Sequence, residues 1–166
     1  MSIGFIGCGN MATAIIKGII KSKTVEENEI NVFDVYAPAV EKLTAEYKIN
    51  KCESECDVVS SSDTVILAVK PNVLPQVLNK INTTLEESDT LLISIAAGKS
   101  TEFIRGALSH NNRIIRVMPN INATVSEAMC AYTANADATE ADKQTAEGEK
   151  VRAQAMACLL YTSPSP

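Results

Sequence analysis

Two glycines near the start of the chain have the spacing of a turn that binds a phosphate-bearing cofactor. Gly7, Gly9 and Ala12 follow the pattern Gly-x-Gly-x-x-Ala. Such a turn uses the first glycine for a sharp bend, the second for close approach of the backbone to a pyrophosphate, and the alanine for tight helix packing. The pattern predicts a dinucleotide site, and the alternative is an ordinary glycine turn between a strand and a helix.

The segments on either side of the turn supply the strand and the helix that this site requires. Ile3–Ile6 is apolar, and Ile15, Ile16 and Ile19 then recur at helical spacing. The N–H groups of the first helical turn have no partner within a helix, and the helix dipole adds partial positive charge there. We therefore expect the phosphates of the cofactor to lie at the start of this helix.

A carboxylate follows the second predicted strand. Ile30–Phe33 is a short apolar segment, and Asp34 comes directly after it. An acid about 20 residues past the glycine turn accepts hydrogen bonds from the adenosine ribose hydroxyls in this class of site. Residues 35–41 contain no lysine or arginine, so a 2′-phosphate would meet a like charge. Asp34 therefore favours NADH over NADPH. The alternative is an aspartate that only begins a turn at the end of the strand.

Strand and helix patterns alternate through the rest of the chain. Short β-branched, apolar runs at 64–69, 91–95 and 113–117 are typical of strands buried on both faces. The intervening helices are predicted at 38–47, 53–62, 73–81 and 101–108, the last capped by Thr101. This alternation predicts an α/β fold of the Rossmann type, with a doubly wound and mainly parallel sheet.

Ligands of such sheets bind outside the carboxyl ends of the strands, so five strand ends should converge on one crevice. The sequence assigns no catalytic side chain. The predicted cofactor-binding residues are Ile6, Gly7, Cys8, Gly9, Asn10, Met11, Ala12, Asp34, Ala68, Val69, Lys70, Pro71, Ala96, Ala97, Gly98, Met118, Pro119 and Asn120.

Composition narrows the class of protein. The chain has 166 residues, of which 46% are hydrophobic and 21% charged, which is ordinary for a soluble domain. The net charge of -5, without a basic cluster, disfavours nucleic acid and anionic membranes as partners. Because we find neither a long apolar run nor a secretory signal, we expect a cytoplasmic protein. Five scattered cysteines and the single His110 indicate neither a disulfide framework nor a metal site.

Four motifs in order give the chain a family resemblance. They are Gly4-Phe5-Ile6-Gly7-Cys8-Gly9-Asn10-Met11, Ala68-Val69-Lys70-Pro71, Ser94-Ile95-Ala96-Ala97-Gly98 and Arg116-Val117-Met118-Pro119-Asn120. Together they strongly resemble pyrroline-5-carboxylate reductase, over residues 1–147. The resemblance implies NADPH- or NADH-dependent reduction of 1-pyrroline-5-carboxylate to proline, and a homo-oligomer for full-length members.

The resemblance also assigns places along the cofactor. It implies that residues 7–11 contact the pyrophosphate and that residues 68–71 lie near the nicotinamide-side ribose. Asn120 and the Ala96-Ala97 turn would then lie near the nicotinamide. Four positions depart from the family pattern: Ile121-Asn122 stands for Thr-Pro, Glu55 for an asparagine on the adenosine side, and Asp34 for the serine or threonine common in NADP-preferring relatives.

The family's helical carboxyl-terminal domain, which holds the substrate carboxylate, has no counterpart here. Residues 148–166 instead resemble no part of the family, and their alternating serine and proline predict a disordered tail. We therefore expect residues 1–147 to form a dinucleotide-binding domain that binds NADH without turnover on its own. The alternatives are a non-catalytic dinucleotide-binding module, or a fragment of another Rossmann reductase.

Overall fold

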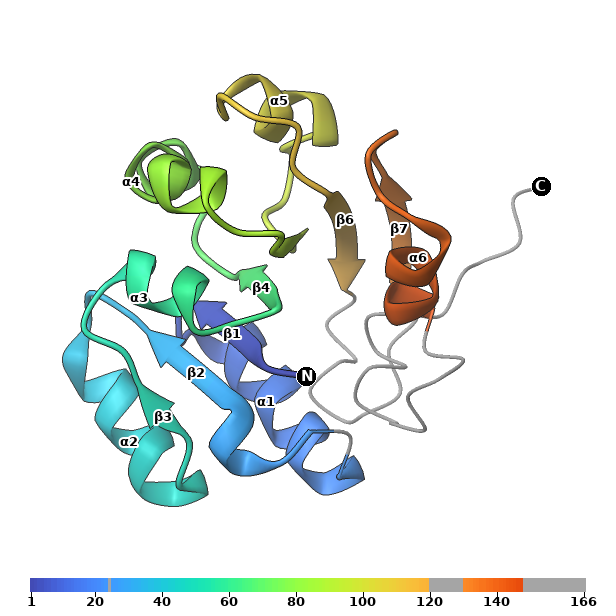
Figure 1. Cartoon of the computed structure of the whole chain (residues 1–166). Helices are drawn as coiled ribbons and strands as arrows, with labels where there is room; N and C mark the ends of the chain where they lie inside the picture. Colours follow the sequence, from blue (N-terminus) through green and yellow to red (C-terminus); the bar gives the residue numbers. More distant parts are fainter. Residues whose placement is uncertain (24, 120–129, 148–166) are drawn as a thin grey trace.

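The computed structural model describes residues 1–23, 25–119 and 130–147. Within these residues the chain forms a seven-stranded sheet with helices on both faces (Figure 1). The strands are β1 (Ile3–Ile6), β2 (Ile30–Phe33), β3 (Asn50–Lys51), β4 (Thr64–Leu67), β5 (Leu91–Ser94), β6 (Ile114–Pro119) and β7 (Cys130–Ala134). The helices are α1 (Asn10–Ser22), the short 3-10 turn η1 (Glu27–Glu29), α2 (Ala37–Tyr47), α3 (Glu55–Ser60), α4 (Leu74–Glu86), α5 (Thr101–Gly106) and α6 (Glu140–Glu147).

The sheet has the strand order β3-β2-β1-β4-β5-β6-β7. Neighbouring strands from β3 to β6 pair in parallel, and β7 pairs antiparallel to β6 at the edge. The first six strands have the order of a doubly wound dinucleotide-binding fold, with its switch point between β1 and β4. The predicted fold class is therefore confirmed.

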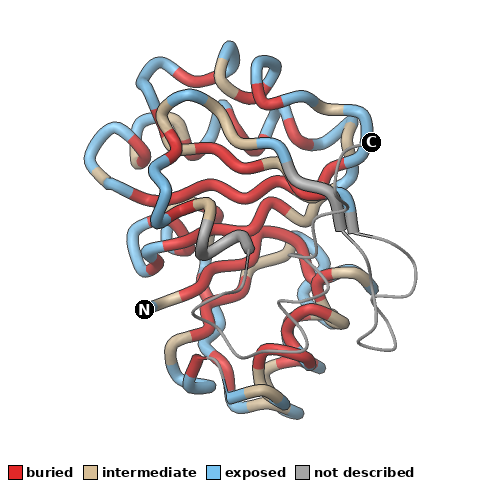
Figure 2. The backbone as a smooth tube through the Cα atoms, turned by 90° about the vertical axis from the view of Figure 1, so that its right-hand side faces the viewer, coloured by how far each residue is buried: buried red, intermediate tan, exposed pale blue. Residues whose placement is uncertain are grey.

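Side chains of successive strand residues point to opposite faces of the sheet, and each face has its own apolar core. Phe5 of β1 packs with α1 and α2 on one face, whereas Ile6 packs with α3 and α4 on the other. Figure 2 shows the central strands as a buried layer between these helices. Gly4 allows α3 to approach β1, because a Cβ there would lie 2.5 Å from Val58 Cγ1. Within the described residues, no helix is long and apolar enough to cross a bilayer.

The structure corrects two details of the prediction. Ser100, not Thr101, caps α5, because its Oγ accepts a hydrogen bond from the Phe103 N–H at 3.1 Å. Strand β6 also continues through Pro119 instead of stopping at Val117, because its last two residues pair with β7. Strands β3 and β7 and helix α6 were not predicted. The predicted tail at 148–166 and the Ile121-Asn122 departure lie outside the described residues.

Candidate functional site

The glycine turn joins three parallel strands at their carboxyl ends. Gly7 has φ +102° and its N–H donates to the Phe33 carbonyl at 2.8 Å. A Cβ on Gly7 would lie 2.7 Å from the Ala68 carbonyl oxygen, so only glycine fits between β1 and β4 here. The turn is therefore held in place by the backbone of both neighbouring strands.

Steric contact with the protein, which explains the glycine at position 7, does not explain the glycine at position 9. A Cβ added at Gly9 would meet no protein atom within 4 Å, and the backbone there is extended, with φ -70° and ψ -177°. Gly9 is also the N-cap of α1, where no side chain caps the helix and no acidic residue lies in the first turn. The open space beside Gly9 and the uncapped helix start fit an anionic group such as a pyrophosphate.

A cleft of about 360 Å³ opens beside Gly9, and we call it the Gly9 cleft. Its walls come from the start of α1 and from the segments that follow β4, β5 and β6. The lining residues are Gly9, Asn10, Met11, Ala68, Val69, Lys70, Pro71, Ile95, Ala96, Ala97 and Met118. Segments far apart in the sequence thus meet at one end of the sheet, as the strand-end argument predicts.

A second cleft of about 270 Å³ lies on the other side of the turn, and we call it the Asp34 cleft. It is formed by the ends of β1 and β2, the start of α3 and one face of α4. Its lining residues are Ile6, Gly7, Phe33, Asp34, Val35, Glu55, Val69, Val73, Gln76, Val77 and Lys80. The glycine turn therefore separates two clefts, as a ligand with two halves joined by a phosphate bridge requires.

Asp34 is fixed against the glycine turn by hydrogen bonds to both of its carboxylate oxygens. Oδ2 accepts the Cys8 N–H at 2.6 Å, and Oδ1 accepts the Tyr36 N–H at 2.8 Å. An ionised carboxylate has about four acceptor positions, so two remain for further donors. Asp34 thus orients the turn and still presents acceptors to the Asp34 cleft.

Cys8 lies within the glycine turn, but its thiol is not a nucleophile. The side chain is buried, and burial, followed by the charge of Asp34, raises the pKa of the thiol to about 12. At neutral pH the thiol is therefore protonated, and the reactive thiolate is scarce. The structure thus gives Cys8 a backbone role, through the N–H that it donates to Asp34.

Most predicted site residues line one of these two clefts. Cys8 instead lines a separate hollow with Asn10 and Tyr36, and Ala12, in the first turn of α1, is buried in the core between α1 and the sheet. Gly98, with φ +70°, lines neither cleft, and the side chain of Pro119 is not among those that the structure describes. Asn120 lies outside the described residues.

Several lining residues were missing from the prediction. Ile95, Phe33 and Val35 lie at strand ends beside predicted residues, whereas the others lie in α3 and α4 or at the start of α4, away from the strand ends. Val73, Val77 and Lys80 are spaced by four and three residues along the chain, so they share one face with Gln76. The helical spacing that begins at Val73 could therefore have predicted that Lys80 lies on the same helix face as the cleft-lining valines.

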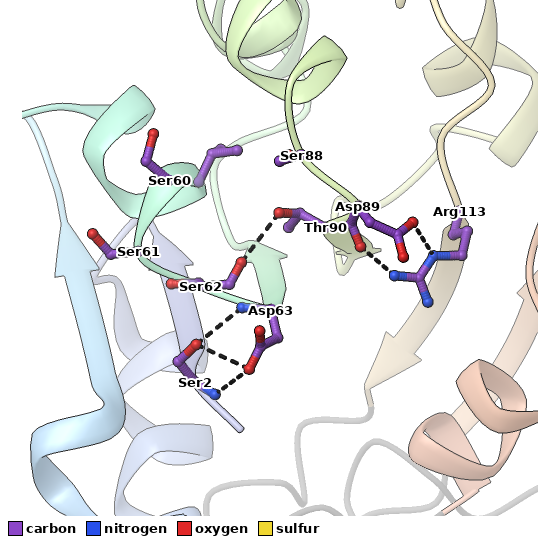
Figure 3. A pocket seen from close by; sticks show the side chains of 10 residues that line it. Ser2, Ser60, Ser61, Ser62, Asp63, Ser88, Asp89, Thr90 and Arg113 are labelled. Carbon is purple, nitrogen blue, oxygen red and sulfur yellow. Dashed lines mark hydrogen bonds and ion pairs between the residues drawn. The ribbon is translucent and has the colours of Figure 1, made fainter.

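The opposite end of the sheet carries a more polar hollow of about 500 Å³, lined in part by Ser2, Ser62, Asp63, Asp89, Thr90 and Arg113 (Figure 3). Its polar groups largely bond to one another. The Ser2 N–H donates to Asp63 Oδ2 at 2.8 Å, and Thr90 Oγ1 donates to the Ser62 carbonyl at 3.1 Å. Because this hollow lies at the amino ends of the strands, we do not take it as the cofactor site.

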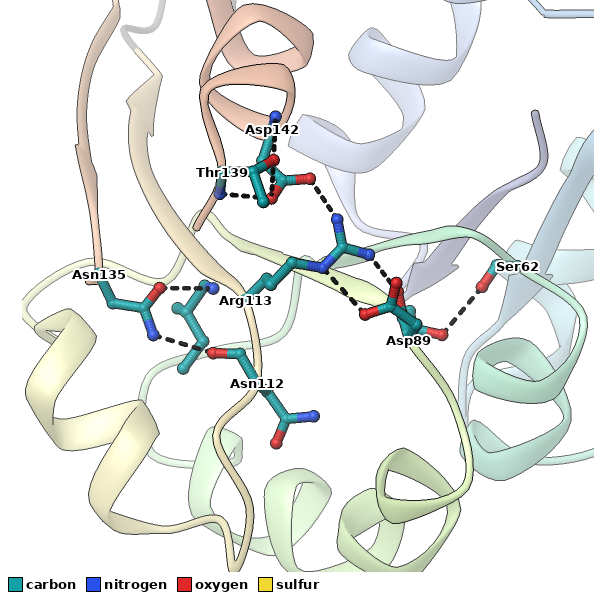
Figure 4. Close-up of polar contacts among 9 residues, drawn as sticks. Ser62, Asp89, Asn112, Arg113, Asn135, Thr139 and Asp142 are labelled. Atoms are coloured by element: carbon teal, nitrogen blue, oxygen red, sulfur yellow. Dashed lines mark hydrogen bonds and ion pairs between the residues drawn. The ribbon is translucent and has the colours of Figure 1, made fainter. Parts of the chain in front are cut away.

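Arg113 beside this hollow binds two acidic residues (Figure 4). Its guanidinium pairs with the buried carboxylate of Asp142 in α6, and Nε lies 3.2 Å from Asp89 Oδ1. Asp142 Oδ2 also accepts the Thr139 N–H at 2.7 Å. The pair of Arg113 with Asp142 fastens α6 to the start of β6, so we read Arg113 as a structural residue.

The sheet order, the open glycine turn and its two flanking clefts define a Rossmann-type NAD(P)-binding domain. Comparison with known sequences agrees, because residues 2–98 match the family described as "NADP oxidoreductase coenzyme F420-dependent". The chain belongs to this family, and within it corresponds to the amino-terminal NAD(P)-binding domain of pyrroline-5-carboxylate reductases.

The relatives support this placement. The chain is 41% identical over 143 residues to pyrroline-5-carboxylate reductase of Escherichia coli (strain K12), which covers 84% of this chain and 52% of that protein. The enzyme of Methanosarcina acetivorans is also 41% identical, over 144 residues, covering 87% of this chain and 53% of the relative. The chain thus spans about half the length of these relatives.

Solved structures agree with the fold. A pyrroline-5-carboxylate reductase from Coxiella burnetii superposes with a TM-score of 0.88 at 28% identity, over 99% of this chain and 59% of that chain. A Plasmodium falciparum pyrroline carboxylate reductase with NADP bound has a TM-score of 0.81 at 23% identity, over 100% of this chain and 58% of that chain.

Proposed function

We propose that this chain binds NADH as the cofactor-binding half of a pyrroline-5-carboxylate reductase. The observation that carries the proposal is the open space beside Gly9. No protein atom requires a glycine there, whereas a close-lying pyrophosphate would. The membership in the family and the match to the curated reductases support the reaction class.

The two clefts suggest where the two ends of the cofactor bind. The adenosine fits the Asp34 cleft, where Val35, Val73 and Val77 supply apolar walls and Asp34 offers acceptors for the ribose hydroxyls. The nicotinamide end fits the Gly9 cleft, between the segments that follow β4, β5 and β6. The pyrophosphate would then cross the glycine turn at the positive end of α1.

The reaction needs little acid or base chemistry from this half of the enzyme. The bound nicotinamide supplies a hydride to the carbon of an imine, which is an electrophile and is readily protonated. Ile95, Ala96 and Met118 present apolar surface at the Gly9 cleft, where they would shield the reacting atoms from water. The chain's own contribution is therefore to hold and orient the cofactor.

The choice of NADH over NADPH is tested with Asp34→Ser. A 2′-phosphate beside the Asp34 carboxylate meets a like charge, so removing the carboxylate should favour NADPH by about 1 to 3 kcal/mol, or roughly fivefold to 150-fold in the ratio of dissociation constants. Calorimetric titration with both cofactors measures this ratio. Asp57→Ser is the matched control, because Asp57 is exposed and lines neither cleft. Equal dissociation constants in the parent protein would contradict the proposed preference.

The reductase activity is tested by a chimera. Residues 1–147 are joined to the remaining carboxyl-terminal half of the Escherichia coli relative, which the present chain does not match. We expect NADH oxidation that depends on 1-pyrroline-5-carboxylate, because the chimera holds both cofactor and substrate. A chimera that folds and binds NADH, yet reduces a different imine and not this one, would redirect the proposal to another reductase.

A further inference from the structure

A buried carboxylate that the proposed chemistry does not use lies in the Asp34 cleft. Glu55 begins α3, and its side chain is only 9% exposed. Its Oε1 accepts a hydrogen bond from Lys80 Nζ of α4 at 2.8 Å. The lysine side chain is 56% exposed, so one partner of this ion pair is buried and the other reaches toward solvent.

The charges of this cleft are few. Among its lining residues, Asp34 and Glu55 are acidic and Lys80 alone is basic. Lys80 is committed to Glu55, so the ion pair leaves no spare positive charge, while Asp34 adds a negative one. A cofactor with a 2′-phosphate would bring roughly two further negative charges into this cleft.

We infer that Glu55 is a second determinant of cofactor choice, which disfavours a 2′-phosphate by holding the Lys80 ammonium in an ion pair. The inference rests on the proposed function, since it assigns the adenosine end of a dinucleotide to the Asp34 cleft. A lysine ammonium is a compact charge on a flexible stem, so once released it can turn toward a phosphate. Partial burial strengthens this attraction, because fewer water molecules screen it.

The test is Glu55→Gln, which keeps the size of the side chain and removes its charge. We expect the dissociation constant for NADPH to fall by about tenfold relative to that for NADH, as for other close charge pairs. Raising the salt concentration should shrink this gain, since screening weakens partly exposed charges. Glu53→Gln is the matched control, because Glu53 is exposed, lines neither cleft, and carries the same charge two residues away.

Two further variants test whether Lys80 causes the gain in NADPH affinity. In the double variant Glu55→Gln with Lys80→Met, the gain in NADPH affinity should disappear. Lys80→Met alone should weaken NADPH relative to NADH, because it leaves the Glu55 carboxylate without its partner. Lys80→Met alone therefore tests the inference through the ratio of the two dissociation constants, even if Glu55→Gln does not fold.

The outcomes separate the two proposals. A parent protein that binds NADH, with an unchanged cofactor ratio in Glu55→Gln, overturns this inference and leaves the proposed function standing. A double variant that keeps the full gain also overturns it, because Lys80 would then play no part. A parent protein that binds neither dinucleotide overturns both proposals.

Discussion

Replacing Gly9 with valine is expected to weaken dinucleotide binding by about a hundredfold or more and to leave the fold intact. The backbone at Gly9 is extended and a Cβ there meets no protein atom, so valine fits the folded chain. The same side chain would occupy the open space where the pyrophosphate approaches. Hydrogen bonds to charged groups contribute about 1.5 to 3 kcal/mol each, so losing two of them weakens binding by about a hundredfold or more.

Calorimetric titration with NADH measures this loss, and circular dichroism checks that the variant is folded. Gly106→Val is the matched control, because Gly106 also has no protein atom near its would-be Cβ and lies at the end of α5, outside both clefts. It should bind NADH as the parent does. A folded Gly9→Val protein with the affinity of the parent would place the pyrophosphate elsewhere.

Replacing Arg113 with methionine is expected to lower the free energy of unfolding by about 3 to 5 kcal/mol, as when one partner of a buried ion pair is removed. The side chain of Asp142 is only 7% exposed, and Arg113 is its one cationic partner among the residues that the structure describes. Arg113 also donates to the backbone carbonyl of Asp89, which precedes β5, so its loss removes a contact between α6 and the sheet and a second contact between the starts of two strands.

Urea unfolding measures this change. Arg105→Met is the control, because Arg105 is more exposed and lies 3.9 Å from Asp137, a separation at which surface pairs contribute about 1 kcal/mol or less. Arg113→Met should still bind NADH at the parent's affinity when folded, since Arg113 lies at the opposite end of the sheet. A stability loss no larger than that of Arg105→Met would show that α6 is held by other contacts.

The strands that position the site were predictable from their composition. The strands β1, β4 and β5 are buried on both faces, so their residues form short continuous apolar runs between turn residues. Strand β3 was missed because its two residues, Asn50 and Lys51, are polar and exposed. Helix α6 was missed because its sequence is mostly polar, and its anchor to Arg113 is a contact between distant segments.

The clefts were predictable where they follow the ends of parallel strands, because these ends meet at one edge of the sheet. Asp34 and Ala96 were placed at the predicted crevice in this way, and Gly9 was placed there by the spacing of the glycine turn. Glu55 was named only as a departure from the family pattern and Lys80 was not named, because they reach the cleft from α3 and α4, and their ion pair joins residues 25 positions apart. Only the packing of these two helices brings the charges together.

The central claim is that a dinucleotide lies across the glycine turn, at the carboxyl end of the sheet. The most direct measurement is the perturbation of backbone amide resonances during titration of the parent protein with NADH. We predict the largest shifts at Gly9, Asn10 and Met11, with further shifts at Tyr36 and Ala97, and none at Ser62 or Thr90. Shifts centred on Ser62, Thr90 and Arg113, or no shifts at saturating NADH, would contradict the account.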